Sequence, residues 1–314
     1  MTYVKDFTWK KNMKASDLVG SLGSVGFQSV ELDKAARIIV KMKESNAKIF
    51  LTFTSNMVTS GLRGFFAQVI RLGMADAIVT TVGSIEEDIM KAHGEKFPIG
   101  TFQHDDTELH ESGTNRVGNI FINNKSYEVF EGMMQHIFKE LYKKQHRWAV
   151  SDMLKEIGLM LKDKNSILYQ AAKNNVPIYC PAITDGAFGF HAFMFQQEHS
   201  DFTIDVVKDF GNILFYTNQD DRKGIIALGG SVSKHHALLA CLLNGGCDYA
   251  VYMTTAHEAS GSVGGATTEE AKSWGKIKDA SDVCTVIGDV TITFPLAMAK
   301  ALDVLAGNKL IKGV

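Results

Sequence analysis

The sequence contains few cysteines and few prolines. It has four of each in 314 residues, and no two cysteines form a CxxC pair. The cysteines are Cys180, Cys241, Cys247 and Cys284. Three of them stand in or beside apolar runs, so we expect buried free thiols in a reducing compartment.

A low-complexity linker is also absent, and the scarcity of proline gives no sign of a break between domains. We therefore predict a single domain spanning residues 1–314. Hydrophobic residues make up 45% of the chain, which is enough to bury a sizeable core.

Neither sign of charge is in excess. Lysine plus arginine number 33 and aspartate plus glutamate number 35, which gives a net charge of −2. Nucleic-acid-binding proteins usually carry a basic excess, so we expect no such partner. No signal-peptide pattern follows Met1, and no apolar run approaches the roughly 20 residues that a membrane span needs. We expect a cytoplasmic protein without a membrane partner.

Helical and strand-like patterns alternate along the chain. Buried strands are expected at 47–53, 76–81, 176–180, 224–228, 248–254 and 283–287. Helices are expected at 32–45, 61–73, 84–93, 126–144, 150–174, 200–212, 233–244 and 293–305. The polar stretch at about 98–120 is expected to be a loop insertion. This alternation predicts a doubly wound α/β fold, with a mostly parallel, Rossmann-like sheet covered by helices on both faces.

Most predicted strands end in small or polar residues. The ends are Thr54-Ser55-Asn56, Thr81-Val82-Gly83, Thr184-Asp185-Gly186, Gly229-Gly230-Ser231, Thr254-Thr255-Ala256 and Gly288-Asp289. Turn chemistry alone explains any one of them. In a parallel sheet, however, all would lie at the edge where doubly wound folds bind ligands. The pattern predicts a nucleotide-sized ligand without naming it, because no GxGxxG fingerprint follows a strand.

Seven blocks carry a resemblance to a known family. They are TSNMVTSGLR (54–63), VTTVGSIEEDIMK (79–91), NRVGN (115–119), CPAITDGAFG (180–189), LGGSVSKHH (228–236), DYAVYMTTAHE (248–258) and EEAKSWGKIK (269–278). In these blocks the chain resembles the deoxyhypusine synthases. The likeness extends from about residue 26 to 305, and the compact amino-terminal region is similar to a short, archaeal-like member.

The resemblance implies an aminobutyl transfer. NAD would take a hydride from spermidine, and an enzyme lysine would carry the butyl group as an imine after diaminopropane leaves. A lysine of the translation initiation factor 5A precursor would then accept the group, and the retained NADH would reduce the product to deoxyhypusine. The resemblance also implies a homotetramer with active sites shared between subunits.

The imine-forming lysine of the family matches Lys276. Such a lysine must be uncharged when it attacks, and Trp274 and Ile277 give it a mostly apolar setting. Trp274 can stack on a cationic amine, although it could instead pack in the core. His235 matches the histidine that contacts the polyamine and could accept a proton, although it could instead cap a helix. No third ligand is in view, so we expect no metal.

Glu86 and Glu87 match an acidic pair, of which one would face the amine and the other the cofactor ribose. Adjacent carboxylates repel each other unless a cation lies between them. Alternatively, they could simply complement a helix dipole. The polyamine-contacting glutamate matches Glu270, and Gly261 and Ser262 are assigned to the same ligand. The implied NAD contacts are Ser55, Asn56, Met57, Val58, Thr59, Thr81, Val82, Gly83, Glu87, Asp185, Gly230, Thr255, Ala256, Asp289 and Val290.

Two family aspartates that grip the polyamine are replaced by Phe190 and Val263. The loss removes two charge-assisted contacts, each worth about 1.5–3 kcal/mol, so the donor could differ from spermidine. Three hypotheses follow from the sequence. The first is a deoxyhypusine synthase. The second is a homospermidine-synthase-like transfer to putrescine or another small amine. The third is a non-catalytic protein that binds NAD or polyamine, against which the retained Lys276 argues.

Overall fold

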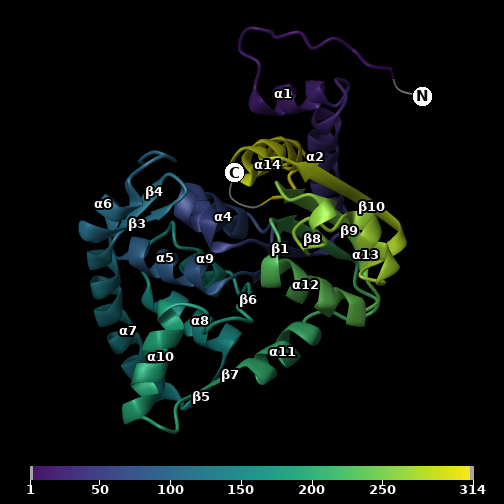
Figure 1. Ribbon diagram of the computed structural model, residues 1–314. Coiled ribbons are helices and arrows are strands. Elements are labelled where there is room, and N and C mark those ends of the chain that lie inside the picture. Colours follow the sequence, from purple (N-terminus) through teal and green to yellow (C-terminus); the bar gives the residue numbers. More distant parts are fainter. Residues whose placement is uncertain (1–2, 312–314) are drawn as a thin grey trace. The chain divides into compact units, whose positions relative to one another are not determined.

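The computed structural model describes residues 3–311. By its internal contacts the chain separates into two compact units (Figure 1). Unit 1 holds the described residues of Met1–Phe53 and Ile213–Val314, together with Leu72–Val79. Unit 2 holds Thr54–Arg71 and Thr80–Asn212. The single domain expected from the sequence stays a prediction.

Unit 1 is built on five parallel strands in the order β10-β9-β8-β1-β2. They are β1 (Lys48–Thr52), β2 (Ala77–Val79), β8 (Lys223–Leu228), β9 (Cys247–Thr254) and β10 (Ile277–Ile287). Every residue of β8 is buried, as expected for the central strand of a sheet that is covered on both faces. The fold class predicted from the sequence, α/β with a mostly parallel sheet, is confirmed.

Helices cover both faces of this sheet. Those of unit 1 are α1 (Ala15–Leu22), α2 (Gln28–Glu44), α12 (Ser231–Leu243), α13 (Thr268–Ser273) and α14 (Val290–Gly307), with a 3₁₀ turn at Glu258–Ser260. Figure 1 shows α2 and α14 on one side of the strands and α12 on the other. At Gly224 of β8, an added Cβ would lie 2.8 Å from the Met42 sulfur of α2. Glycine therefore lets α2 lie close against the sheet.

Helix α14 is long and apolar enough to cross a membrane by length and composition alone. Its 18 residues have a mean hydropathy of 1.4, and a third of them are buried. A helix in a protein core meets the same criteria. The buried residues are Val290, Phe294, Ala297, Met298, Ala301 and Leu305. They form one stripe, and α14 packs against α1 and α2. The absence of a membrane partner stays a prediction.

Unit 2 is mostly helical. Its helices are α3 (Ser55–Met57), α4 (Arg63–Arg71), α5 (Val82–Ala92), α6 (Asp106–Glu111), α7 (Asn124–Lys144), α8 (Val150–Met160), α9 (Ile167–Lys173), α10 (Ala187–Glu198) and α11 (Val206–Leu214), of which α11 ends in unit 1. A π-helical turn, η1 (Val58–Leu62), joins α3 to α4. The strands are β3 (Thr114–Val117), β4 (Ile120–Asn123), β5 (Arg147–Ala149), β6 (Ile178–Tyr179) and β7 (Thr203–Asp205).

Several segments of unit 2 differ from the sequence prediction. The helix expected over 200–212 is the strand β7 followed by α11. Within 98–120, expected to be a loop, the chain forms α6 and most of the β3–β4 hairpin. Asp105 caps α6, and Arg116 donates to both carboxylate oxygens of Asp106 at 2.6 Å, so polar side chains hold this segment together. The helix expected over 150–174 is two helices, because the Ser166 side chain caps the start of α9.

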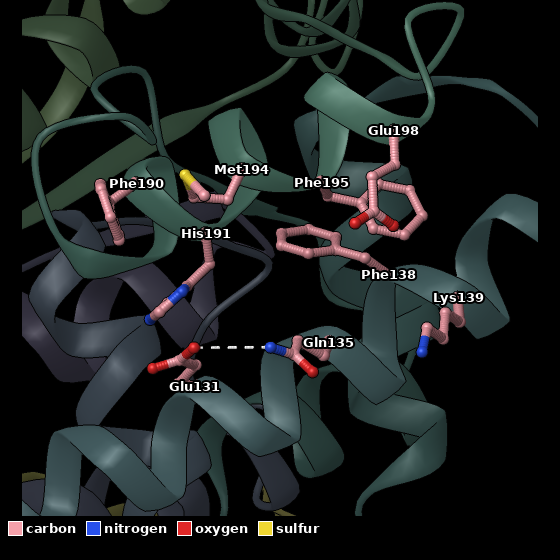
Figure 2. Close-up of a pocket in the computed structure, with 9 residues that line it drawn as sticks. All are labelled: Glu131, Gln135, Phe138, Lys139, Phe190, His191, Met194, Phe195 and Glu198. Atoms are coloured by element: carbon pink, nitrogen blue, oxygen red, sulfur yellow. Dashed lines mark hydrogen bonds between the residues drawn. The ribbon is translucent and has the colours of Figure 1, made fainter.

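An aromatic cluster joins α7 to α10. The Phe138 ring lies 5.4 Å from Phe188, 5.6 Å from Phe195 and 5.7 Å from Phe202, measured between ring centroids. Beside the cluster is a hollow of about 490 Å³, drawn in Figure 2. Glu131 and Gln135 of α7 face Phe190, His191 and Met194 of α10 across it. No helix was predicted over α10, whose apolar residues lie on all sides and hide the helical period.

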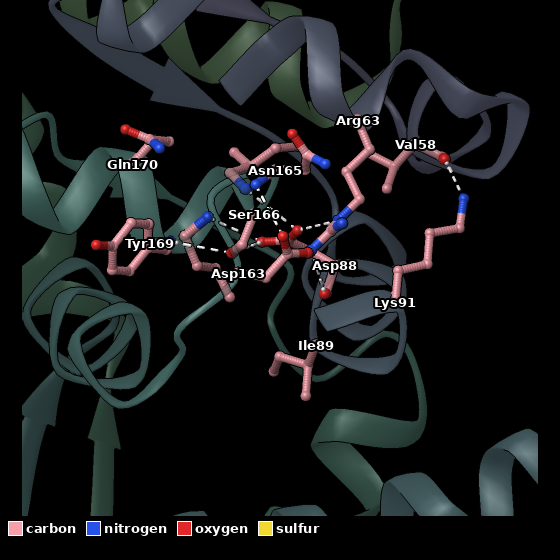
Figure 3. Close-up of polar contacts among 12 residues, drawn as sticks. Val58, Arg63, Asp88, Ile89, Lys91, Asp163, Asn165, Ser166, Tyr169 and Gln170 are labelled. Atoms are coloured by element: carbon pink, nitrogen blue, oxygen red, sulfur yellow. Dashed lines mark hydrogen bonds and ion pairs between the residues drawn. The ribbon is translucent and has the colours of Figure 1, made fainter. Parts of the chain in front are cut away.

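A fully buried carboxylate, that of Asp88, fixes α5 to its neighbours (Figure 3). It accepts hydrogen bonds from Arg63 Nε at 2.5 Å and from Ser166 Oγ at 2.8 Å. It also accepts from the backbone amides of Ile167 and Leu168 at 3.1 and 2.8 Å. Arg63 pairs in addition with Asp163 at 2.7 Å. The start of α4, the middle of α5 and the start of α9 therefore meet at one charge.

We predict that Asp88→Ala lowers the free energy of unfolding by about 3–5 kcal/mol, because it leaves buried Arg63 and three other donors without this acceptor. Urea unfolding followed by circular dichroism measures the change. Asp106→Ala, which removes an exposed carboxylate from Arg116, is the control and should change stability by about 1 kcal/mol or less. If both variants lose the same free energy of unfolding, the hydrogen bonds of Asp88 do not hold α4, α5 and α9 together.

Candidate functional site

A hollow of about 250 Å³ in unit 1 contains the predicted imine-forming lysine; we call it the lysine pocket. Its walls come from α12, from β9, from the loop 261–267 and from α13. Trp274 and Lys276, which follow α13, complete the lining. It is lined by Lys234, His235, Leu238, Tyr252, Gly261, Val263, Ala266, Thr267, Glu270, Ala271, Trp274 and Lys276. Six residues predicted or discussed from the sequence, His235, Gly261, Val263, Glu270, Trp274 and Lys276, are therefore neighbours in the fold.

Local structure explains where Lys276 lies. Thr267 caps α13 by accepting from the Glu270 amide at 3.2 Å. After α13 the chain reverses at Gly275, whose φ of 71° is readily adopted only by glycine. The Lys276 amide then donates to Ala271 O, and its carbonyl accepts from the Cys247 amide. The backbone of Lys276 is thus bonded on both sides, immediately before β10.

The Lys276 side chain is half-buried, and its Nζ lies 5.1 Å from the centroid of the Trp274 ring. This is within the range of a cation–π contact. Trp274 is 65% exposed, so it is not part of the core of unit 1. His235 is exposed and makes no cap to α12. A histidine, a carboxylate and an aromatic face therefore surround an amine that solvent can reach.

A second lysine of this pocket, Lys234, was not identified from the sequence. Its side chain is 1% exposed, and its Nζ donates to Val263 O and Ala266 O, both at 2.9 Å. The same nitrogen lies 3.8 Å from the centroid of the Tyr252 ring. Burial lowers the pKa of Lys234 to about 8. A signal existed: Lys234 falls on the buried stripe of α12 with Ala237, Leu238 and Cys241.

The carboxyl ends of β8 and β9 form a second hollow in unit 1, of about 620 Å³; we call it the strand-end hollow. It is lined by Gly229, Gly230, Ser231, Val232, His235, Thr254, Thr255, Ala256, Ser262, Val263 and Gly264. His235 and Val263 line the lysine pocket as well, so the two hollows are neighbours. Four predicted ligand contacts, Gly230, Thr255, Ala256 and Ser262, meet here as the strand-end pattern suggested.

The turn at the strand-end hollow has the backbone features of an anion site. A Cβ at Gly230 would clash with the backbone of Gly264, so only glycine lets the loop that contains Gly264 pack against this turn. Gly229 and Ser231 both have positive φ, 78° and 65°, and α12 begins at Ser231. Backbone amides at such a turn favour anions.

Asp289 and Val290 do not line either hollow of unit 1. The Asp289 carboxylate accepts from the Thr291 amide at 2.7 Å and caps α14, and Val290 is buried in the core. Their assignment to the cofactor stays a prediction.

Unit 2 brings a second set of predicted residues together, where α3 and α5 begin. The Ser55 amide donates to Thr81 Oγ1 at 3.0 Å, and a Cβ at Gly83 would lie 2.8 Å from Ser55 Cβ. Thr59 Oγ1 donates to Glu87 Oε1 at 2.7 Å. Val82, Met57 and Val58 have buried side chains, whereas Asn56 is exposed.

The acidic pair lies in the second turn of α5 and is buried. Glu86 and Glu87 are 6% and 8% exposed, so the helix dipole alone does not account for them. Burial raises the pKa of Glu86, whose Oε1 accepts from the Phe188 amide at 2.7 Å. Asp185 lies close enough to raise that pKa further. Two predicted ligand contacts, Glu86 and Asp185, are thus neighbours.

Burial also raises the pKa of Glu87, to about 7, against the effects of Thr59 and Lys91. Lys91, which was not identified from the sequence, donates to Val58 O at 2.6 Å, and burial lowers its pKa. Glu87 Oε2 is buried without a hydrogen-bond partner among the described residues. An unpaired buried carboxylate oxygen is costly, and a bound cation or donor would satisfy it.

The two residues that replace family aspartates lie on different units. Val263 lines both hollows of unit 1. Phe190 is 60% exposed on α10 and lines the hollow beside α7 in unit 2 (Figure 2).

The four cysteines are free and buried, as predicted. Burial raises the pKa of the Cys180 thiol, which keeps it protonated and unreactive.

The model of the deoxyhypusine synthase family matches residues 17–301. A curated relative, the probable deoxyhypusine synthase of Thermoplasma acidophilum, is 35% identical over 301 residues, which are 95% of this chain and 97% of that protein. The deoxyhypusine synthase of Candida glabrata is 35% identical over 335 aligned positions, covering 92% of this chain and 86% of that protein.

Among solved structures, one from Entamoeba histolytica whose name carries the same family has a TM-score of 0.69 to this chain. The two are 27% identical, and the match covers 96% of this chain and 97% of that one. The similarity therefore extends over both units rather than over a single motif.

We predict that Glu87→Gln makes the protein less sensitive to pH between about 4.5 and 7. Because burial raises the pKa of Glu87 from 4.5 to about 7, the fold favours the protonated form. The stability that Glu87 contributes is complete below pH 4.5 and is lost as the pH rises through 7. Without polyamine or NAD, the variant should gain up to about 3 kcal/mol on the wild type across this window.

Denaturant unfolding at several pH values measures this difference. Glu128→Gln, on the exposed face of α7, is the control and should follow the wild type throughout. Parallel curves for Glu87→Gln and the wild type would mean that the fold does not raise the pKa of Glu87.

Proposed function

Because the chain belongs to the deoxyhypusine synthase family, we propose that it transfers the aminobutyl group of spermidine to a lysine of the translation initiation factor 5A precursor, with NAD as cofactor. The proposal includes a homotetramer that acts in the cytoplasm. The observation that carries it is the lysine pocket, where Lys276 shares one hollow with His235, Glu270 and Trp274.

Lys276 carries the butyl group. Its amine attacks the imine carbon of the oxidised donor, a C–N bond forms, and diaminopropane leaves with the electron pair of the broken C–N bond. The nucleophile must be uncharged, and a solvent-accessible amine can lose its proton to a nearby base. His235 lines the same hollow and can take that proton. The acceptor lysine then displaces Lys276 by the reverse of this exchange.

The chemistry that bound NAD would supply is hydride acceptance from the donor and hydride return to the product. In unit 1 the strand-end hollow is suited to its pyrophosphate, because α12 begins there at Ser231, after two residues, Gly229 and Gly230, that bring no bulky side chain. His235 lines this hollow and the lysine pocket, which supports hydride transfer next to the amine. In unit 2 the further residues proposed to contact the cofactor are Glu87, its donor Thr59, and the neighbouring Ser55, Thr81 and Gly83.

The polyamine cation is bound by carboxylates. Glu270 supplies one in the lysine pocket. Glu86 and Glu87 supply the other pair, and a cation would stabilise their ionised forms, which burial disfavours. The unpaired Oε2 of Glu87 is the oxygen best suited to accept from an ammonium group.

We predict that Lys276→Ala abolishes covalent trapping of the donor. The protein is incubated with NAD and spermidine labelled in its butyl part, and the imine is reduced with borohydride. Label should be fixed on the wild type, and the variant should retain less than roughly 1% of it, because the other amine of the pocket, that of Lys234, is buried and held by the carbonyls of Val263 and Ala266.

Lys272→Ala is the matched control, since Lys272 lies on α13 but pairs with Glu269 at 2.9 Å and does not line the pocket. It should trap label like the wild type. Adding either the translation factor or putrescine to the labelled wild type distinguishes two acceptors. Label that moves only to putrescine would contradict the protein acceptor and support a homospermidine-synthase-like reaction.

We predict that Val263→Asp lowers the KM for spermidine by about tenfold, because it adds a carboxylate to the pocket wall and one charge-assisted contact is worth about 1.5 kcal/mol or more. Steady-state rates with spermidine and with putrescine as donors measure it. Val263→Asn, similar in size but uncharged, is the control. An unchanged KM would mean that the donor's ammonium groups do not reach this wall.

A further inference from the structure

We propose that Lys234 is a positioning residue of the lysine pocket, whose buried ammonium holds the loop 261–267 against α12 so that His235 and Lys276 face the same space. For its catalytic consequence the inference rests on the proposed function. The loop-holding part stands on the geometry of unit 1 alone.

The ammonium of Lys234 has an unusual environment. Lysine is almost never fully buried without a paired charge, yet this side chain is 1% exposed. Among the described residues, no carboxylate oxygen lies within ion-pair distance of it. Its partners are two backbone carbonyls of one loop, those of Val263 and Ala266, and the face of the Tyr252 ring.

Backbone carbonyls compensate a charge only when the loop that carries them keeps one conformation. A methionine would fill the same space without the desolvation that a buried charge entails. A lysine in this position therefore does more for the conformation of the loop than for the stability of the core.

The loop requires such a tether. It contains Gly261, Gly264 and Gly265, and Gly261 has a φ of 64°, so the free chain has much conformational freedom to lose. Its own hydrogen bonds form a turn in which the Gly265 and Ala266 amides share Ser262 O, with Ser262 Oγ as a second, longer acceptor for Gly265. The two bonds from Lys234 attach this turn to α12.

The hydrogen bonds from Lys234 to the loop connect two segments that each carry a proposed reacting group. On α12, Lys234 precedes His235. On the other side, the loop runs directly into Thr267, which caps α13 and so fixes Glu270 and Trp274 ahead of Lys276. The hydrogen-bond and cation–π partners of Lys234 Nζ are Val263 O, Ala266 O and the Tyr252 ring rather than Lys276 or His235, so it would act through these neighbours.

The chain offers a matched control in Lys223. This lysine is 0% exposed, and its Nζ donates to two backbone carbonyls of another loop, those of Asn218 and Asp221, at 2.8 and 2.6 Å. It begins β8 and does not line the lysine pocket. Lys223→Met thus removes the same kind of tether from the same unit without touching the proposed site.

The experiment compares Lys234→Met with Lys223→Met in the full-length protein, with hydrogen exchange and kinetics as readouts. In Lys234→Met, the amides of Gly265 and Ala266 should exchange at least about tenfold faster, and those of 218–221 should not change. In Lys223→Met the pattern should be reversed. The turnover rate and borohydride trapping should fall on the order of 100-fold only in Lys234→Met, because misplaced reacting groups lose rate steeply.

Each outcome decides the inference. Equal exchange of the 261–267 loop in the two variants overturns it. Faster exchange with trapping that matches Lys223→Met also overturns it, because the tether would then have no catalytic consequence. If the wild type itself traps no label, the proposed function fails. The exchange data alone then decide whether Lys234 holds the loop.

Discussion

A charge removed from water must be met by hydrogen-bonding partners, and in this protein those partners fix the residues around both candidate sites. In unit 1 the Lys234 ammonium attaches a glycine-rich loop to α12. In unit 2 the Asp88 carboxylate joins α4, α5 and α9. The Lys234 ammonium bonds to two backbone carbonyls, and the Asp88 carboxylate accepts from two backbone amides and from the side chains of Arg63 and Ser166. Directional bonds of this kind fix geometry more than they add stability.

The number of hydrogen-bonding partners distinguishes a buried charge that holds helices together from a buried charge that is left without a full set of partners. Asp88 has four donors, and its carboxylate has no oxygen to spare. Glu87, the preceding residue on the same helix, has one side-chain donor and a buried oxygen without a partner among the described residues. Burial therefore raises the pKa of Glu87, and a ligand would complete what the fold leaves open. Strained or unsatisfied polar groups are expected where a protein binds its ligand.

The sequence predicted the parts of the fold that depend on local pattern. Apolar runs revealed the parallel strands, and the small or polar residues at the ends of β8 and β9 (Gly229-Gly230-Ser231 and Thr254-Thr255-Ala256) revealed the hollow beside them, since both depend on neighbours in sequence. The helix α10 was missed because its apolar residues surround it on all sides. Lys234 was missed because a lysine usually lies in solvent, although its place on the buried stripe of α12 was a usable signal.

Long-range bonds were beyond the reach of the sequence. Asp88 meets Ser166 and Leu168, which follow it by 78 and 80 residues, and no periodicity marks such a pair. For the same reason, the sequence predicted Glu86 and Glu87 as an acidic pair but not how differently each is bonded. Glu86 accepts from the backbone of residue 188, and Glu87 from the side chain of residue 59.

The composition of the lysine pocket bears on which part of a donor it can hold. It contains two lysines and only one carboxylate, Glu270, and its remaining wall includes Leu238, Val263 and Ala266. Two lysines in so small a hollow limit the further positive charge that it can hold to the one ammonium group that Glu270 would neutralise, whereas hydrocarbon would displace water from the apolar wall at a gain. The pocket is therefore matched to the four-carbon fragment that Lys276 would carry and to one charged end of the polyamine beside Glu270, and the other charged groups of the polyamine require carboxylates outside this hollow.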